Sequence, residues 1–147
     1  MAIIAALLAV VSVLGQILVA KELLNQQKAS DQWAYSQAKD IRHYMASVAA
    51  DTLRAGKGDQ ALINKYVGDD KRYKNDTTNI QEKARELEEA SERAGRHAFR
   101  MHLGEVFLEV AIVLSSLAIL SKRSFFWLVG IASAAAGSVI ALTSLLV

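Results

Sequence analysis

The fold of this chain of 147 residues is decided by residues 97–120, which read HAFRMHLGEVFLEVAIVLSSLAIL. Charged residues give way to apolar ones near Leu103, and no proline or other stop signal interrupts the passage. A helix that spans a bilayer needs roughly 20 predominantly apolar residues. The stretch therefore predicts one continuous helix that stands in water and then enters the membrane.

The same separation of apolar and charged blocks extends over the whole chain. Residues 1–20 contain no charged side chain, whereas residues 21–102 contain 15 Lys or Arg and 13 Asp or Glu. We predict an all-α membrane protein with transmembrane helices at residues 1–20, 103–121 and 125–147. The first helix is expected to stay uncleaved. A signal peptide begins with positively charged residues, and here no Lys or Arg precedes the apolar segment.

The composition excludes several classes of function. The formal net charge of +2 leaves no basic surface of the kind that nucleic-acid binding requires. The chain has no Cys, which excludes disulfides and thiolate metal sites and fits a bacterial inner membrane. No phosphate loop, activated nucleophile or strand-based motif is recognisable, so we expect no enzyme, no cofactor and no small-molecule substrate.

The orientation in the membrane is read from the short turn between the second and third apolar segments. This turn carries Lys122 and Arg123, and the positive-inside rule assigns such a turn to the cytoplasm. Residues 21–102 are then expected in the periplasm.

The extramembrane domain shows the spacing of a coiled coil. Two series of residues recur at alternating steps of three and four. The first series is Leu24, Gln27, Asp31, Ala34, Ala38, Ile41, Met45 and Val48, and the second is Ile80, Ala84, Leu87, Ser91, Ala94, Ala98 and Met101. We predict that the two series pack against each other as an antiparallel helical hairpin. Lys21 is then expected near His102, and Trp33 level with Ala90 and Ala94.

The tip of this hairpin is predicted within residues 56–77. A glycine-rich break at 56–58 ends the first helix, and Asp59 is a candidate N-cap of a short amphipathic piece. The chain is expected to turn back between Asp69 and Thr78, and Thr78 opens a capping-box pattern.

Small residues form stripes on two of the apolar segments. Ala2, Ala5, Ala9, Ser12 and Gln16 follow one helical face of the first segment, and Gly130, Ala134, Gly137 and Ala141 follow one face of the third. Such stripes let helix backbones approach closely in lipid. Both are expected to be packing surfaces, either within the chain or between copies.

Residues 29–39, ASDQWAYSQAK, followed by Ile41, are a distinctive segment just after the first apolar helix. With the His near the start of the second apolar helix and the two-cation turn before the third, this segment resembles the bacterial membrane-protein family called domain of unknown function 4337. The resemblance implies a helical fold and a membrane location. It transfers no activity.

Four residues of this segment are candidate interaction residues: Asp31, Trp33, Tyr35 and Gln37. Residues two apart on a helix diverge by about 200°, so the four cannot all face one neighbouring helix. Trp33 lies roughly 20 Å beyond the first apolar segment, too far for an interfacial aromatic belt. A neighbouring subunit is the preferred partner, and tight packing within the hairpin is the alternative.

The sharpest chemical pattern is His102, Glu105 and Glu109, whose spacing places them on one face of a helix. Glu109 lies about 10 Å beyond His102 along the axis and is expected to turn inward. We interpret the pattern as a structural lock, in which Glu109 pairs with Lys21 or Gln16. The alternatives are a proton or cation pathway and a weak metal site formed by all three residues. His43 and His97 are expected to be ordinary surface residues.

Together these features predict a non-enzymatic structural or accessory subunit that self-associates or joins a larger membrane complex. The alternative function is a proton- or cation-conducting homo-oligomer that uses Glu105 and Glu109.

Overall fold

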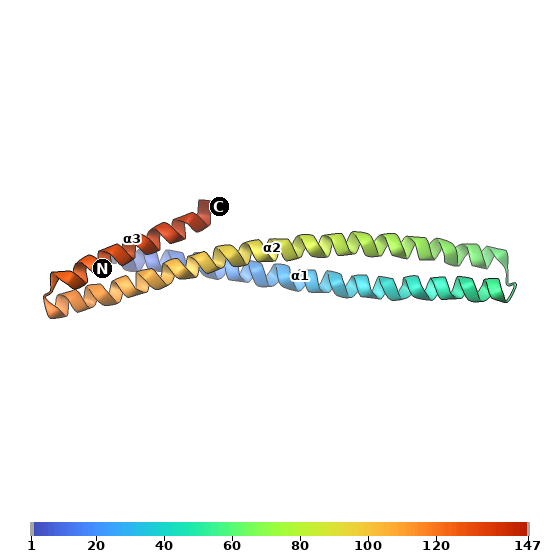
Figure 1. Cartoon of the computed structure of the whole chain (residues 1–147), viewed down its shortest axis with the longest axis horizontal. Helices are drawn as coiled ribbons and strands as arrows, with labels where there is room; N and C mark the ends of the chain where they lie inside the picture. Colours follow the sequence, from blue (N-terminus) through green and yellow to red (C-terminus); the bar gives the residue numbers. More distant parts are fainter. Residues whose placement is uncertain (1, 147) are drawn as a thin grey trace. The chain divides into compact units, whose positions relative to one another are not determined.

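The computed structural model describes residues 2–146 and the side chains of residues 2–144. It contains three α-helices: α1 spans Ala2–Ala55, α2 spans Gln60–Ser121 and α3 spans Ser124–Leu146 (Figure 1). No strand occurs in residues 2–146, so the predicted all-helical class is confirmed. Each of the three helices contains a stretch long and apolar enough to cross a membrane.

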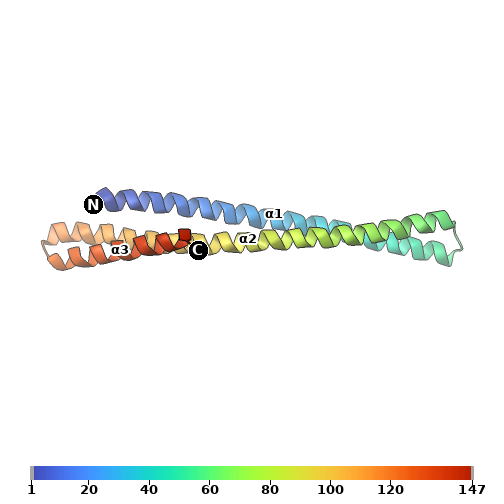
Figure 2. The same ribbon diagram turned by 90° about the horizontal axis from the view of Figure 1, so that it is seen from above.

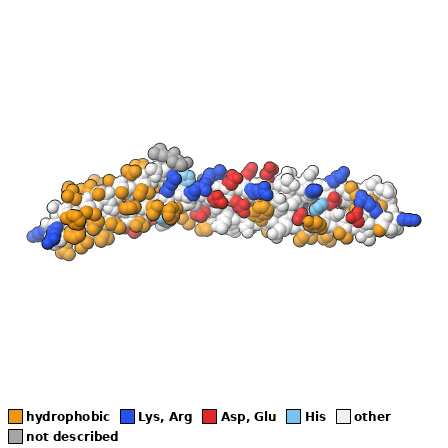
Figure 3. All heavy atoms as spheres, viewed as in Figure 1, with side chains coloured by type: hydrophobic (Ala, Val, Ile, Leu, Met, Phe, Trp, Pro, Cys, Tyr) orange, Lys and Arg blue, Asp and Glu red, His pale blue; other side chains and the backbone are white. Residues whose placement is uncertain are grey.

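The chain divides into two compact units. Unit 1 comprises Met1–Leu23 and Ser91–Val147, and unit 2 comprises Leu24–Ala90. In unit 2, α1 and α2 lie side by side and run in opposite directions (Figures 1 and 2). In unit 1, α3 runs back along α2, and α1 packs beside them. Hydrophobic side chains gather over unit 1, whereas charged side chains gather over unit 2 and the adjoining part of α2 (Figure 3).

The turn between α1 and α2 is short, which corrects the predicted tip over residues 56–77. Lys57 takes the left-handed conformation, with φ of 53°, and reverses the chain direction. The Asp59 carboxylate accepts the Ala61 amide at 3.0 Å, which confirms the predicted N-cap. α2 begins directly afterwards, at Gln60.

The predicted return between Asp69 and Thr78 is wrong, because α2 continues through it without a break. Gly68 is a helical residue, and the Thr78 hydroxyl donates to the Lys74 carbonyl at 3.2 Å instead of capping a new helix. Local preference for a turn in this polar stretch is overridden by contacts with α1. One of these contacts joins Asp76 to α1, as described below.

The two predicted heptad series have opposite outcomes. On α2, all seven residues from Ile80 to Met101 are buried or half-buried, so that series faces inward. On α1, all eight residues from Leu24 to Val48 are exposed, so that series does not face α2. The contact surface of α1 is instead made by Ala29, Ser36, Ala46 and Ala50, which are all buried. Small residues are favoured on this face because they let the two backbones approach closely.

The register between α1 and α2 also differs from the prediction. In unit 1, the Ser91 hydroxyl donates to the Glu22 carbonyl at 2.9 Å. His102 lies beside Gly15, with its ring 3.6 Å from the position that a glycine Cβ would take. The expected neighbourhood of Lys21 and His102 is therefore wrong by about two helical turns. The short turn causes the shift, because it returns the chain earlier than the long predicted tip would.

Two glycines bring α2 and α3 into backbone contact in unit 1. A Cβ on Gly104 would lie 2.8 Å from the Gly137 carbonyl oxygen, and a Cβ on Gly137 would lie 2.7 Å from the Gly104 oxygen. Gly130 and Ala141 on the same face of α3 are buried, and Ala134 is half-buried. The predicted stripe on the third apolar segment is therefore a packing surface within the chain.

The predicted stripe on the first apolar segment is not a packing surface within the chain. Ala2, Ala5, Ala9 and Gln16 are exposed, and Ser12 is half-buried. α1 uses larger side chains there: Val11 forms a buried cluster with Met101, Leu108 and Ala141, and Ile4, Leu8, Leu14 and Leu18 pack against it. These larger side chains fill the space between α1 and its neighbours, because buried space left unfilled forfeits dispersion contacts.

A pair of identical substitutions tests the close approach of α2 and α3. Gly104→Ala is expected to destabilise unit 1 by about 1–3 kcal/mol, because the new methyl group overlaps the α3 backbone. Gly68→Ala, where nothing lies within 4 Å, is expected to stabilise α2 by up to about 1 kcal/mol. Thermal unfolding in mild detergent, followed by circular dichroism, measures both. Equal effects of the two substitutions would contradict the described packing.

Candidate functional site

A polar cluster lies where the apolar part of α2 begins. The Nδ1–H of His102 donates to Glu105 Oε2 at 3.0 Å. The Glu105 side chain is 20% exposed and that of His102 is 47% exposed. The Ser12 hydroxyl of α1 faces the same carboxylate. The structure therefore joins two of the three predicted residues and adds Ser12, whose position only the packing of α1 on α2 determines.

Glu109 is not part of this cluster. Its side chain is exposed, among the exposed Val106, Val110 and Val113, and it makes no hydrogen bond or ion pair within residues 2–146. Gln16 is exposed as well. The expected inward turn of Glu109 and its pairing with Lys21 or Gln16 are wrong for the single chain. α1 packs apolar side chains against this part of α2, and an inward carboxylate would lose its hydration there without gaining a partner.

The predicted weak metal site does not assemble. In the described part of the chain, no three His, Asp, Glu or Cys side chains could hold one metal ion. His102 and Glu105 are close enough for hydrogen bonding and proton exchange, and Glu109 is separate from both.

The four candidate interaction residues of the 29–39 segment divide into two sets. Trp33 is half-buried, and its indole N–H donates to Glu88 Oε1 at 2.8 Å, so its partner lies within the same chain. Asp31, Tyr35 and Gln37 are exposed. This division follows from the helical geometry that prevents all four from facing one neighbour.

Lys39 ties α1 to α2 from within the same segment. Its Nζ lies 2.7 Å from Asp76 Oδ2, and its side chain is only 14% exposed. The Tyr35 and Tyr73 rings flank the ammonium group, with centroids at 5.5 and 5.4 Å. The hydrogen bond to Asp76 raises the pKa of Lys39 above its usual value of 10.5, so the contact stays charged at neutral pH.

His43 and His97 are not the ordinary surface residues that the sequence suggested. His43 Nδ1 lies 2.6 Å from Asp70 Oδ1 in unit 2, and both side chains are mostly buried. In unit 1, the His97 Nδ1–H donates to the Ser144 carbonyl at 2.7 Å, and the Ser144 hydroxyl donates back to the His97 carbonyl at 2.9 Å. Both histidines are positioned by partners distant in sequence, which no local pattern reveals.

The eight exposed residues of the α1 heptad series form a surface that we call the outer stripe (residues 24, 27, 31, 34, 38, 41, 45 and 48). Its large members are strongly exposed: Ile41 at 60%, Met45 at 66% and Val48 at 64%. A shallow groove beside it is lined by Tyr44, Met45, Val48 and Ala49. The predicted heptad pattern is therefore present on α1, but it does not face α2.

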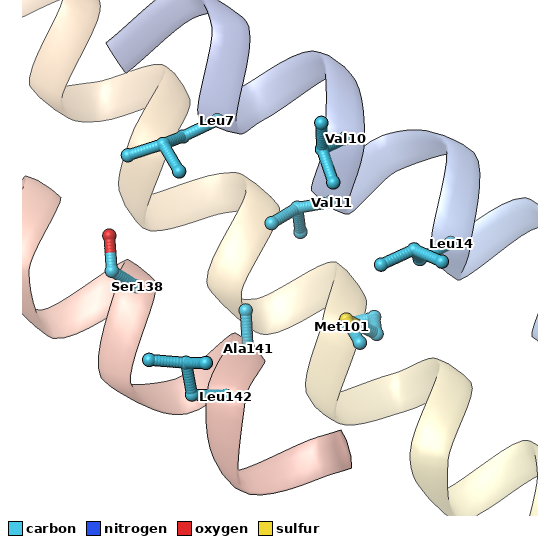
Figure 4. A pocket seen from close by; sticks show the side chains of 8 residues that line it. All are labelled: Leu7, Val10, Val11, Leu14, Met101, Ser138, Ala141 and Leu142. Atoms are coloured by element: carbon cyan, nitrogen blue, oxygen red, sulfur yellow. The ribbon is translucent and has the colours of Figure 1, made fainter. Parts of the chain in front are cut away.

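Unit 1 also contains an apolar fissure of about 180 Å³ (Figure 4). α1 lines it with Val11, α2 with Met101, and α3 with Ala141 and Leu142. The Ser138 side chain also borders it. No sequence pattern identified the fissure, because it depends on how three separate helices lie against one another.

A family model described as Domain of unknown function (DUF4337) matches residues 1–147. No curated protein and no solved structure matches the chain.

Proposed function

The chain belongs to the DUF4337 family along its whole length, and we propose that it is a non-enzymatic integral membrane protein of the bacterial inner membrane. In this proposal it acts as a structural or accessory subunit that self-associates or joins a larger membrane complex. The outer stripe is the single observation that carries the proposal.

The exposure of unit 1 supports the membrane location. Only 11, 17 and 22% of the residues in the most apolar windows of α1, α2 and α3 are buried within the chain. Leaving that much apolar surface in water is unfavourable by roughly 25 cal/mol for each Å². Three apolar helices with outward-facing hydrophobic side chains are what a bilayer accommodates.

The orientation belongs to the same proposal. The turn with Lys122 and Arg123 faces the cytoplasm, and the turn between α1 and α2 lies in the periplasm. Residues 24–90 form a unit of their own and carry most of the charged side chains, so they lie outside the bilayer as an antiparallel helical hairpin.

Single cysteines test location and orientation together, because the chain has none of its own. In intact cells, a membrane-impermeant maleimide is expected to label Ala61→Cys and to leave Ser124→Cys unlabelled. Both variants should stay in the membrane after an alkaline carbonate wash. The reverse labelling would overturn the orientation, and release by carbonate would overturn the membrane location.

The outer stripe supports association between copies. It is apolar along most of its length, with Asp31 as its one charged member, and it has the spacing of a helix-packing seam. Within unit 2, α2 packs against another face of α1 and leaves the stripe exposed. Copies inserted in one membrane share an orientation, so a symmetry axis normal to the bilayer brings their stripes together in parallel.

Polar substitutions on the stripe test this association. The double variant Ile41→Gln and Met45→Gln is expected to weaken self-association by at least about tenfold, because it removes apolar surface from the centre of the contact. Leu62→Gln, which removes an exposed apolar residue of α2 in the same unit, is the matched control and should have little effect. Native mass spectrometry in mild detergent measures stoichiometry. A strictly monomeric parent without any co-purifying partner would contradict the proposal.

Glu109 favours one alternative, a proton- or cation-conducting homo-oligomer. An exposed carboxylate within an apolar helix is costly in lipid, and a pathway between copies would give it water or an ion. Glu105, one turn away, would belong to the same pathway.

A flux measurement in liposomes separates the two functions. For the structural subunit we expect no proton flux above that of empty liposomes. For the conducting oligomer we expect flux that falls at least about tenfold in Glu109→Gln. It should persist in Glu92→Gln, an exposed glutamate outside the apolar segment. Flux in the parent that requires Glu109 would replace the structural proposal with the conducting one.

A further inference from the structure

Three arginines share one face of α2 in unit 1, just before its apolar part. Arg93, Arg96 and Arg100 follow one another at steps of three and four, which places them on neighbouring turns of the same face. Together with His97 they line a groove of about 160 Å³.

Two of the three arginines, Arg96 and Arg100, have at most a weak ion pair in the part of the chain that the structure describes. No Asp or Glu occurs between Arg93 and Gly104. Arg96 reaches Glu92 only at 3.6 Å, with both side chains mostly exposed, and such surface pairs contribute little. Arg100 is exposed and makes no ion pair within residues 2–146. The guanidinium groups of Arg96 and Arg100 are therefore available for an external anion.

His97, one of the residues that line the groove, is held in place by α3. The His97 Nδ1–H donates to the Ser144 carbonyl, and the Ser144 hydroxyl donates to the His97 carbonyl, at 2.7 and 2.9 Å. This reciprocal pair fixes the imidazole and the turn of α2 that carries the arginines. A fixed groove loses less entropy on binding than a flexible one.

The position along α2 indicates which anion the groove meets. The apolar segment begins near Leu103, so Arg100 and Arg96 lie about 5 and 10 Å before it along the helix axis. The headgroup layers add roughly 10–15 Å in total to the hydrocarbon core, or about 5–7 Å on each side, so Arg100 lies within this layer and Arg96 just outside it. The long side chain of Arg96 can reach back into the layer. Guanidinium groups also bind phosphate oxygens in a two-pronged geometry that a lysine cannot provide.

We propose that Arg93, Arg96 and Arg100, with His97, form a binding site for the phosphate of an anionic phospholipid headgroup. The site holds α2 at a defined depth in the bilayer. This inference rests on the proposed membrane location and is independent of self-association through the outer stripe.

Retention of lipid during native mass spectrometry tests the site. The parent protein is equilibrated with equal amounts of phosphatidylglycerol and phosphatidylcholine in mild detergent. We expect the parent to retain the anionic lipid with at least about tenfold preference. The triple variant Arg93→Gln, Arg96→Gln and Arg100→Gln should lose that preference. If the triple variant does not fold, as judged by its helicity, Arg100→Gln alone should reduce the preference by at least about threefold.

A matched triple variant separates a site from general attraction by charge. Lys65→Gln, Lys71→Gln and Lys74→Gln removes the same charge from exposed positions on α2 in unit 2 and should keep the full preference. Equal loss in the two triple variants would overturn the site. Displacement of the lipid by millimolar inorganic phosphate, but not by chloride of equal ionic strength, would assign the groove to free phosphate instead.

The membrane location can fail separately from the lipid site. Release of the parent by an alkaline carbonate wash would remove the premise of the site. A parent that resists carbonate yet retains both lipids equally would overturn the lipid site alone.

Discussion

Close approach of helix backbones is the constraint on which the rest of this structure depends. Ala29 and Ser36 in unit 2, and Gly104 with Gly137 in unit 1, stand where larger side chains would push the helices apart. A helix whose contact face is made of small residues must carry its large apolar residues elsewhere. In both units, many of them consequently face outward.

The outward apolar surface has a different meaning in each unit. In unit 1 it extends around all three helices, which fits lipid on every side. In unit 2 it includes the outer stripe, and charged residues occupy neighbouring positions, which fits a protein partner better than lipid. Glu109 is an exposed carboxylate within the apolar surface of unit 1. The arginine face lies on α2 just before its apolar segment begins.

Sequence reasoning succeeded where one helix carries its own signal and failed where two helices must be matched. The N-cap at Asp59 and the packing face of α2 from Ile80 to Met101 are local patterns, and both are confirmed. The face of α1 was misassigned because apolar spacing identifies a seam without identifying its neighbour. Of the candidate site residues, His102 and Glu105 are in contact, as their spacing on one helix predicts. The separation of Glu109 from them depends on the apolar side chains of α1 that pack against this part of α2.

The sequence by itself determined the helical class, the three apolar segments and the unbroken passage of α2 through the charged-to-apolar boundary at Leu103. These features follow from composition, from periodicity and from the absence of proline, which act over a few turns of one helix. Only the tertiary structure decided the register, the face that α1 turns to α2, and the partners of Trp33 and His97. Those depend on which backbones can come close enough to touch, a property of pairs of helices that neither helix encodes alone.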